Sequence, residues 1–218
     1  MIAFLSNPLT LVVWGGLATV SVALLLIDLR RNNREIVGLM QWVWILTVAY
    51  SGPIGLGLYF WAGRKQIPHD DIWRRACRST AHCFSGCGGG EVAGVFIAAG
   101  LLGLGTWWIT GISFVLAYIA GFALTAGPLM QEGLPVSRAL SDAFYSETAS
   151  ITVMEISAIG VDISLSKAAT MSQPLFWTSL ILSLTVGFAA AYPVNALLIR
   201  FGVKEGMHDP RKMAAHAH

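Results

Sequence analysis

The stretch VAGVFIAAGLLGLGTWWITGISFVLAYIAGFALTAGPLM, residues 92–130, contains no charged side chain. A membrane-spanning helix needs roughly 20 predominantly apolar residues, so this run is too long for one crossing. Gly103 and Gly105 stand near its middle and are followed by Trp107 and Trp108. Tryptophan is enriched at the membrane–water interface. We therefore predict two spans joined by a tight interfacial turn.

The rest of the chain has a similar composition. Of its 218 residues, 55% are hydrophobic and 12% are charged, whereas soluble domains carry about 25% charged residues. We predict an all-α fold, a polytopic transmembrane helical bundle of about six spans in a lipid bilayer, because helices satisfy their backbone groups within lipid. The predicted spans are residues 9–27, 36–61, 83–104, 107–129, 143–161 and 175–201.

The segment before the third span, residues 68–81, differs from its neighbours. Asp70 and Asp71 stand four residues before Arg74 and Arg75, the favourable order for helical ion pairs. We predict a short interfacial helix that leads into the third span.

Two Gly-Pro pairs, Gly52-Pro53 and Gly127-Pro128, lie within or at the end of predicted spans. Proline removes a backbone donor and clashes with the preceding turn, so each pair should kink or end its helix. We expect residues 1–204 to form one bundle and residues 205–218 to form a flexible tail that contains methionine and histidine.

The distribution of lysine and arginine predicts the orientation of the bundle. With six crossings, one side holds ten basic residues and the other holds four. The positive-inside rule then places both termini in the cytoplasm, and we expect the protein in a bacterial inner membrane. Arg30, Arg31 and Arg34 in the first loop oppose this orientation.

Several function classes lose support. The net charge is +2, and no basic block is long enough to follow a nucleic-acid backbone, so nucleic acid is not an expected partner. The chain has no Gly-x-x-x-x-Gly-Lys loop, no Gly-x-Ser-x-Gly elbow and no His-Glu-x-x-His motif, which argues against direct ATP coupling and against these hydrolase types. A role other than catalysis is therefore favoured.

The third span opens with an unusual polar motif, TAHCFSGCGGGE, residues 80–91. Cys83, Cys87 and Glu91 stand at positions i, i+4 and i+8, so they share one helical face, with His82 beside it. A second row, Gly86, Gly90 and Gly94, has the same spacing. Such small residues let a neighbouring helix approach closely, which predicts that this part of the span faces the bundle interior.

The fifth span carries a matching row. Glu147, Met154 and Glu155 stand at i, i+7 and i+8 along one side of a helix. Ionisable residues inside a membrane usually face the bundle interior and tend to mark ion or substrate pathways. We expect the rows of the third and fifth spans to converge.

The converging groups would be thiols, an imidazole, carboxylates and a thioether. Thiolates and thioethers favour Cu(I), and thiolate with imidazole also suits Zn²⁺. The sequence therefore predicts binding, and transport or sequestration, of a soft transition metal, with copper ahead of zinc. The predicted ligands are His82, Cys83, Cys87, Glu91, Glu147, Met154 and Glu155.

Two other functions stay open. A lowered thiol pKa at Cys83 or Cys87 would suit an oxidoreductase that acts on quinone or lipid. Alternatively, the polar residues only lock the helices together in a structural or assembly subunit. The bundle is small for a transporter with two internal halves, so a homodimer is a plausible assembly.

The polar motif resembles that of a family of small bacterial membrane proteins known as domain of unknown function 4396. Its hallmark is similar to His82-Cys83-x-x-Gly86-Cys87, followed by Gly90-Glu91, and a later Met154-Glu155. The resemblance covers roughly residues 75–200. Glu91 stands where the family pattern has aspartate. The resemblance implies a bundle with a membrane-embedded polar motif and an association with copper handling, but it supplies no reaction.

Overall fold

The computed structural model describes residues 2–166 and 169–213, which fold into helices without a strand. Six helical segments are long and apolar enough to cross a membrane, which confirms the predicted fold class. Two π-helical turns, η1 and η2, continue α3 and α4. The elements are α1 (Ile2–Leu5), α2 (Pro8–Asn32), α3 (Gly38–Leu58), η1 (Tyr59–Gly63), α4 (Ile72–Val95), η2 (Phe96–Leu101), α5 (Thr106–Gln131), α6 (Val136–Ser166), α7 (Pro174–Arg200) and α8 (Pro210–Met213).

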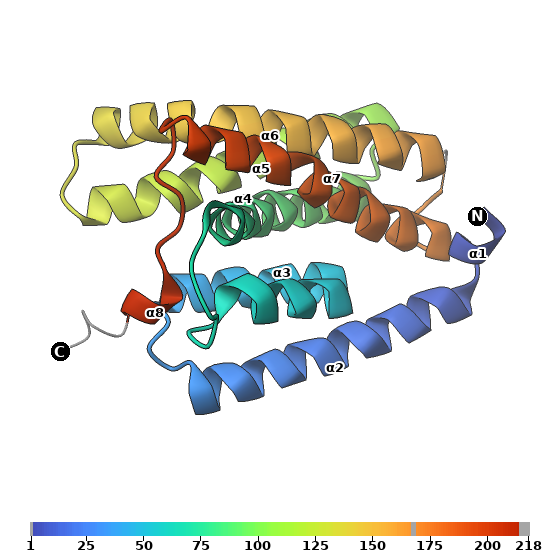
Figure 1. The fold of residues 1–218 in the computed structure, drawn as a ribbon. Coiled ribbons are helices and arrows are strands. Elements are labelled where there is room, and N and C mark those ends of the chain that lie inside the picture. The colour runs from blue at the N-terminus through green and yellow to red at the C-terminus, as the bar shows by residue number, and fades with distance from the viewer. Residues whose placement is uncertain (1, 167–168, 214–218) are drawn as a thin grey trace.

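Helix α4 lies at the centre of the bundle. It contacts α5, α6 and α7 on one side and α3 on the other, while α2 packs outside α3. Figure 1 shows this layering, with α2 and α3 below α4 and with α5, α6 and α7 above it. The polar motif of the sequence is therefore enclosed on all sides by other helices.

Helix α3 does not cross the bundle in one direction. Gly52 has φ 54° and ψ −129°, a backbone conformation that glycine adopts at little cost, and the chain turns back there before Pro53. The rings of Trp44 and Tyr59 consequently pack 5.5 Å apart, although a straight helix would separate these positions by about 22 Å. Helix α3 is thus a re-entrant helical hairpin with its apex at Gly52.

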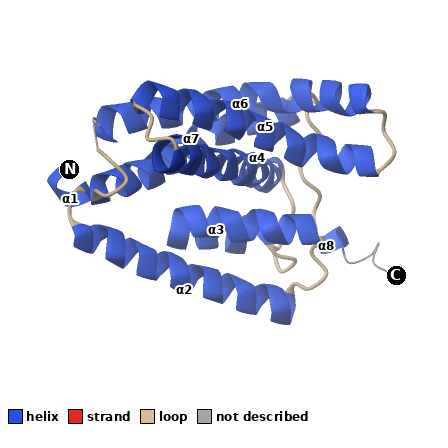
Figure 2. Cartoon of the chain, turned by 180° about the vertical axis from the view of Figure 1, so that it is seen from behind, coloured by secondary structure: helices blue, strands red, loops and turns tan. Residues whose placement is uncertain are grey.

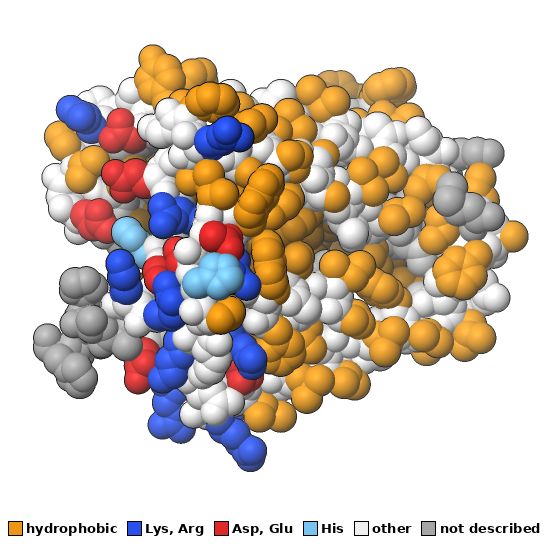
Figure 3. Space-filling view, viewed as in Figure 1, with side chains coloured by type: hydrophobic (Ala, Val, Ile, Leu, Met, Phe, Trp, Pro, Cys, Tyr) orange, Lys and Arg blue, Asp and Glu red, His pale blue; other side chains and the backbone are white. Residues whose placement is uncertain are grey.

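The re-entrant hairpin places the first two loops at the same end of the molecule. Lys65 Nζ, after the hairpin, lies 2.9 Å from Glu35 Oε2, before it. Lys65 N also donates to Asn33 Oδ1 at 2.9 Å. The arginines of the first loop therefore join the other basic residues at one end of the bundle, which Figure 3 shows as a charged end beside a largely apolar surface.

The reversal of α3 also changes the placement of the termini. The backbone of Leu5 accepts a hydrogen bond from Thr178 at the start of α7, and the C-terminal segment follows the other end of α7. Figure 2 shows the two terminal helices, α1 and α8, at opposite ends of the bundle. The prediction that both termini share one side is wrong, because it counted α3 as a full crossing.

The predicted interfacial helix at residues 68–81 is also corrected. Helix α4 begins at Ile72, where the Asp71 side chain accepts a hydrogen bond from Arg74 N at 2.8 Å. It continues without a break through the polar motif, and both Arg74 and Arg78 are buried. Asp70 pairs with Arg78 at 2.8 Å. These ion pairs let a charged first turn lie inside the bundle instead of on the lipid surface.

The glycine row of α4 is confirmed as a close helix contact. A Cβ on Gly86 would lie 3.1 Å from the Cα of Gly121 on α5, and Cβ atoms on Gly90 and Gly94 would clash with the α5 backbone near Ala117 and Ser113. Since only glycine leaves room at these positions, the row sets the distance between α4 and α5.

Candidate functional site

The centre of the candidate site is a hydrogen bond between α4 and α6. Cys83 Sγ donates to Glu147 Oε2 at 2.6 Å, and both side chains are buried. The two predicted polar rows therefore meet at this point. We call the surrounding buried or half-buried polar residues the thiol–lysine cluster, which comprises Thr80, His82, Cys83, Thr125, Glu147, Ser150, Asn195 and Lys204.

A lysine from beyond the last long helix completes this cluster. Lys204 Nζ lies 2.7 Å from the same Glu147 oxygen, 3.1 Å from Asn195 Oδ1 and 3.8 Å from Cys83 Sγ. Burial by itself would lower the pKa of the Lys204 ammonium, but the attraction of the Glu147 carboxylate and its hydrogen bond to Lys204 outweigh burial and raise the pKa. Lys204 is therefore a buried cation beside the thiol.

His82 lies at the edge of the cluster, toward α5. Its Nε2 is 3.5 Å from Thr125 Oγ1, which in turn donates to Glu147 Oε1 at 3.3 Å. The His82 Nδ1 atom is buried without a hydrogen-bond partner among the described residues. The Leu124 backbone lies near the His82 ring.

Two further sulfur-containing side chains, Cys87 and Met154, lie near Cys83. Cys87 stands one helical turn after Cys83 on α4, and Met154 stands on α6. Both are buried in the apolar cluster that also contains Cys83. Cys87 Sγ faces Gly121 of α5, where an added Cβ would lie 3.0 Å away, while Met154 packs against Gly187 of α7. Three sulfur atoms thus share one enclosed region.

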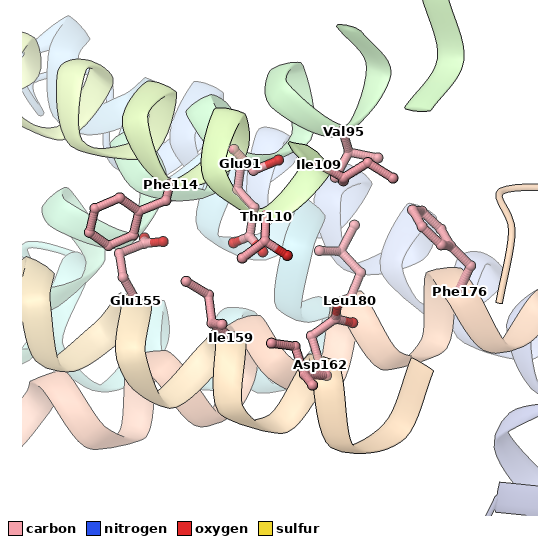
Figure 4. Close-up of a pocket in the computed structure, with 12 residues that line it drawn as sticks. Glu91, Val95, Ile109, Thr110, Phe114, Glu155, Ile159, Asp162, Phe176 and Leu180 are labelled. Atoms are coloured by element: carbon pink, nitrogen blue, oxygen red, sulfur yellow. The ribbon is translucent and has the colours of Figure 1, made fainter. Parts of the chain in front are cut away.

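Glu91 and Glu155 face a separate cavity between α4, α5, α6 and α7, which also contains Asp162. The close-up in Figure 4 shows these carboxylates around the cavity. Asp162 Oδ1 accepts from Ser179 Oγ at 3.0 Å. The Cys87 side chain lies beside Glu155, so Cys87 stands between the thiol–lysine cluster and this cavity.

The structure does not gather all seven predicted ligands at one point. Within residues 2–166 and 169–213, no three histidine, cysteine, aspartate or glutamate side chains are arranged to hold a metal ion together. Cys83 and Glu147 touch, with His82 beside them, whereas Glu91 and Glu155 belong to the cavity. The ligand assignment remains a prediction.

Sequence reasoning missed Lys204, Asn195, Thr125 and Asp162. Asn195 and Asp162 carried a usable signal, because each is a strongly polar residue within an apolar helix. Lys204 carried none, since it stands among other polar residues after α7. Its position 121 residues from Cys83 means that only folding brings the pair together.

We compared the chain with protein-family models, with curated proteins and with solved structures. The family model described as Domain of unknown function (DUF4396) matches residues 72–204, from the start of α4 to Lys204. This chain belongs to that family. Searches of curated proteins and of solved structures found no match to it. The matched region of the family includes both the thiol–lysine cluster and the cavity.

Proposed function

We propose that this family member binds a soft transition-metal cation inside the membrane, copper ahead of zinc, and moves or sequesters it. The contact between the Cys83 thiol and the Glu147 carboxylate carries the proposal. A thiol must lose its proton to become a metal ligand, and Glu147 Oε2 is placed to receive the proton of Cys83 Sγ. Cys87, Met154 and His82 would supply further soft or borderline ligands.

Lys204 gives this proposal a second support. Its ammonium already occupies a cation position between Cys83, Glu147 and Asn195. A metal cation that enters would repel the ammonium, since like charges interact strongly where water is scarce. Protonation of Glu147 would at the same time weaken its attraction to Lys204. Metal entry and withdrawal of Lys204 are therefore coupled in our proposal.

We further propose that the basic end of the bundle faces the cytoplasm of a bacterial cell, following the positive-inside rule. Helix α8 lies at that end, and helix α1 lies at the opposite one. The thiol–lysine cluster, which includes Lys204, then lies toward the cytoplasmic side of the membrane. The cavity lined by Glu91, Glu155 and Asp162, which we call the carboxylate cavity, lies toward the other side.

Metal analysis of the purified protein tests the binding step. The full chain, purified in detergent under reducing conditions, would be incubated with Cu(I) or Zn²⁺, washed and measured by plasma mass spectrometry. We expect about one metal ion per chain, lost in the Cys83→Ala, Cys87→Ala double variant because metal–thiolate bonds hold the ion.

Two control variants separate the site from incidental binding. Cys77→Ala removes the third buried cysteine, which packs in a different apolar cluster, and should leave the metal content unchanged. Replacement of His208, His216 and His218 by alanine removes the histidines of the tail and should likewise leave the metal content unchanged. Residues 214–218 lie outside the described part of the chain. Metal that persists in the double variant, or that never binds, would overturn the proposal.

A further inference from the structure

We propose that the carboxylate cavity binds a partly hydrated, hard divalent cation through oxygen ligands. This site is separate from the soft-metal site and does not depend on it. The cavity has a volume of about 40 Å³, whereas a single water needs about 10–15 Å³ of such space. It therefore has room for one ion and a small number of waters.

The side chains around the cavity match a hard cation. Oxygen atoms come from Glu91, Glu155 and Asp162, and from the hydroxyls of Thr110 and Ser113. The other described lining residues are apolar, so no sulfur or nitrogen ligand and no basic side chain lines it. Oxygen-only sites suit ions such as Mg²⁺ and Ca²⁺ and not copper.

Two buried polar atoms beside the cavity have no partner within the described part of the protein, which favours a ligand there. Glu91 Oε2 and Ser113 Oγ are buried and have no hydrogen-bond partner among the described residues. Glu91 is 8% exposed and Ser113 is 5% exposed, and both line the cavity. Buried polar groups in proteins are almost always paired. An ion with its waters would supply partners to both.

The arrangement of carboxylates favours a divalent ion. Several carboxylates that share a low-dielectric space repel one another, and a double positive charge offsets more of this repulsion than a single one. Because no three carboxylates among the described residues are arranged to hold an ion by themselves, the ion keeps part of its water shell, as Mg²⁺ commonly does. Asp162, which also lines the cavity, is half-buried and lies near the end of α6.

Calorimetric titration of the full chain tests this site. After chelator treatment in detergent and choline chloride, the protein would be titrated with CaCl₂, with MgCl₂ and with NaCl. We expect saturable uptake of one divalent ion per chain, with affinity weakened about tenfold or more in Glu91→Gln and in Asp162→Asn. The ratio of Ca²⁺ to Mg²⁺ affinity would identify the preferred ion.

Matched variants keep this result distinct from soft-metal binding. Glu132→Gln removes an exposed carboxylate at the basic end and should bind as the wild type does. The Cys83→Ala variant, which leaves Cys87 beside Glu155 in place, should also retain divalent uptake. Thermal unfolding without ions would verify that each variant is folded. A wild-type protein that takes up only Na⁺ or no ion, or folded Glu91→Gln and Asp162→Asn variants that bind normally, would overturn the proposal.

Discussion

At the scale of single residues, we predict that Lys204 contributes strongly to stability. Its ion pair with Glu147 is buried, with side-chain exposures of 5% and 1%. Lys204→Met would leave the Glu147 carboxylate without its cation. We expect a loss of about 3–5 kcal/mol in the free energy of unfolding, the usual cost of breaking one side of a buried pair. Chemical unfolding in detergent measures it.

A second ion pair serves as the control for this prediction. Lys65 and Glu35 are 2.9 Å apart, but they are 36% and 46% exposed, so Lys65→Met should cost only about 0–1 kcal/mol. Adding Glu147→Gln to Lys204→Met should restore part of the lost stability, because no unpaired charge remains. Equal costs for the two lysine variants would contradict the buried pair.

At the scale of helices, the contact between α4 and α5 depends on its glycines. Gly90→Ala would place a methyl group against the α5 backbone near Ala117, and forced overpacking typically costs about 1–3 kcal/mol. The neighbouring Gly89→Ala is the control, since its Cβ would only touch Tyr50 Oη at 3.5 Å. Alanine there should be neutral or stabilising by up to about 1 kcal/mol.

Thermal unfolding of the two glycine variants, measured side by side, would test the contact. The expected order of stability is Gly89→Ala at or above the wild type and Gly90→Ala clearly below it. If Gly90→Ala unfolds at the wild-type temperature, α5 does not lie as close to α4 as the structure places it.

At the scale of the whole molecule, the reversal of α3 predicts an unusual pattern of surface labelling. Single reporters Arg31→Cys and Gln66→Cys flank the re-entrant hairpin, and Gly105→Cys lies in the loop before α5. The native cysteines are buried, so they should react slowly. We expect a membrane-impermeant maleimide to label Arg31→Cys and Gln66→Cys from the cytoplasmic side only, and Gly105→Cys from the other side only.

This experiment distinguishes the re-entrant hairpin from a full crossing. A continuous α3 would put positions 31 and 66 on opposite sides, so labelling of the two from different sides would refute the reversal. Labelling of both from outside the cell would keep the hairpin but invert the proposed orientation. The homodimer stays a prediction, which the mass of the detergent-solubilised protein would test.

The helical membrane fold and the two rows of candidate residues could be predicted from the amino-acid sequence. Hydropathy is a property of local composition, so lipid-crossing helices can be predicted from a window of sequence. The positions of Cys83, Cys87 and Glu91 on one face follow from the helical period alone. The glycine row predicted its close contact for the same reason.

The way in which these elements meet could be learned only from the folded structure. The reversal at Gly52 depends on one glycine backbone conformation and on packing against α2, which a hydropathy window cannot detect. The pairing of Cys83 with Glu147 requires the register of α4 against α6, and Lys204 reaches them from a distant part of the chain. Such contacts depend on where whole helices pack, and the residues that surround a position in the sequence do not specify that packing.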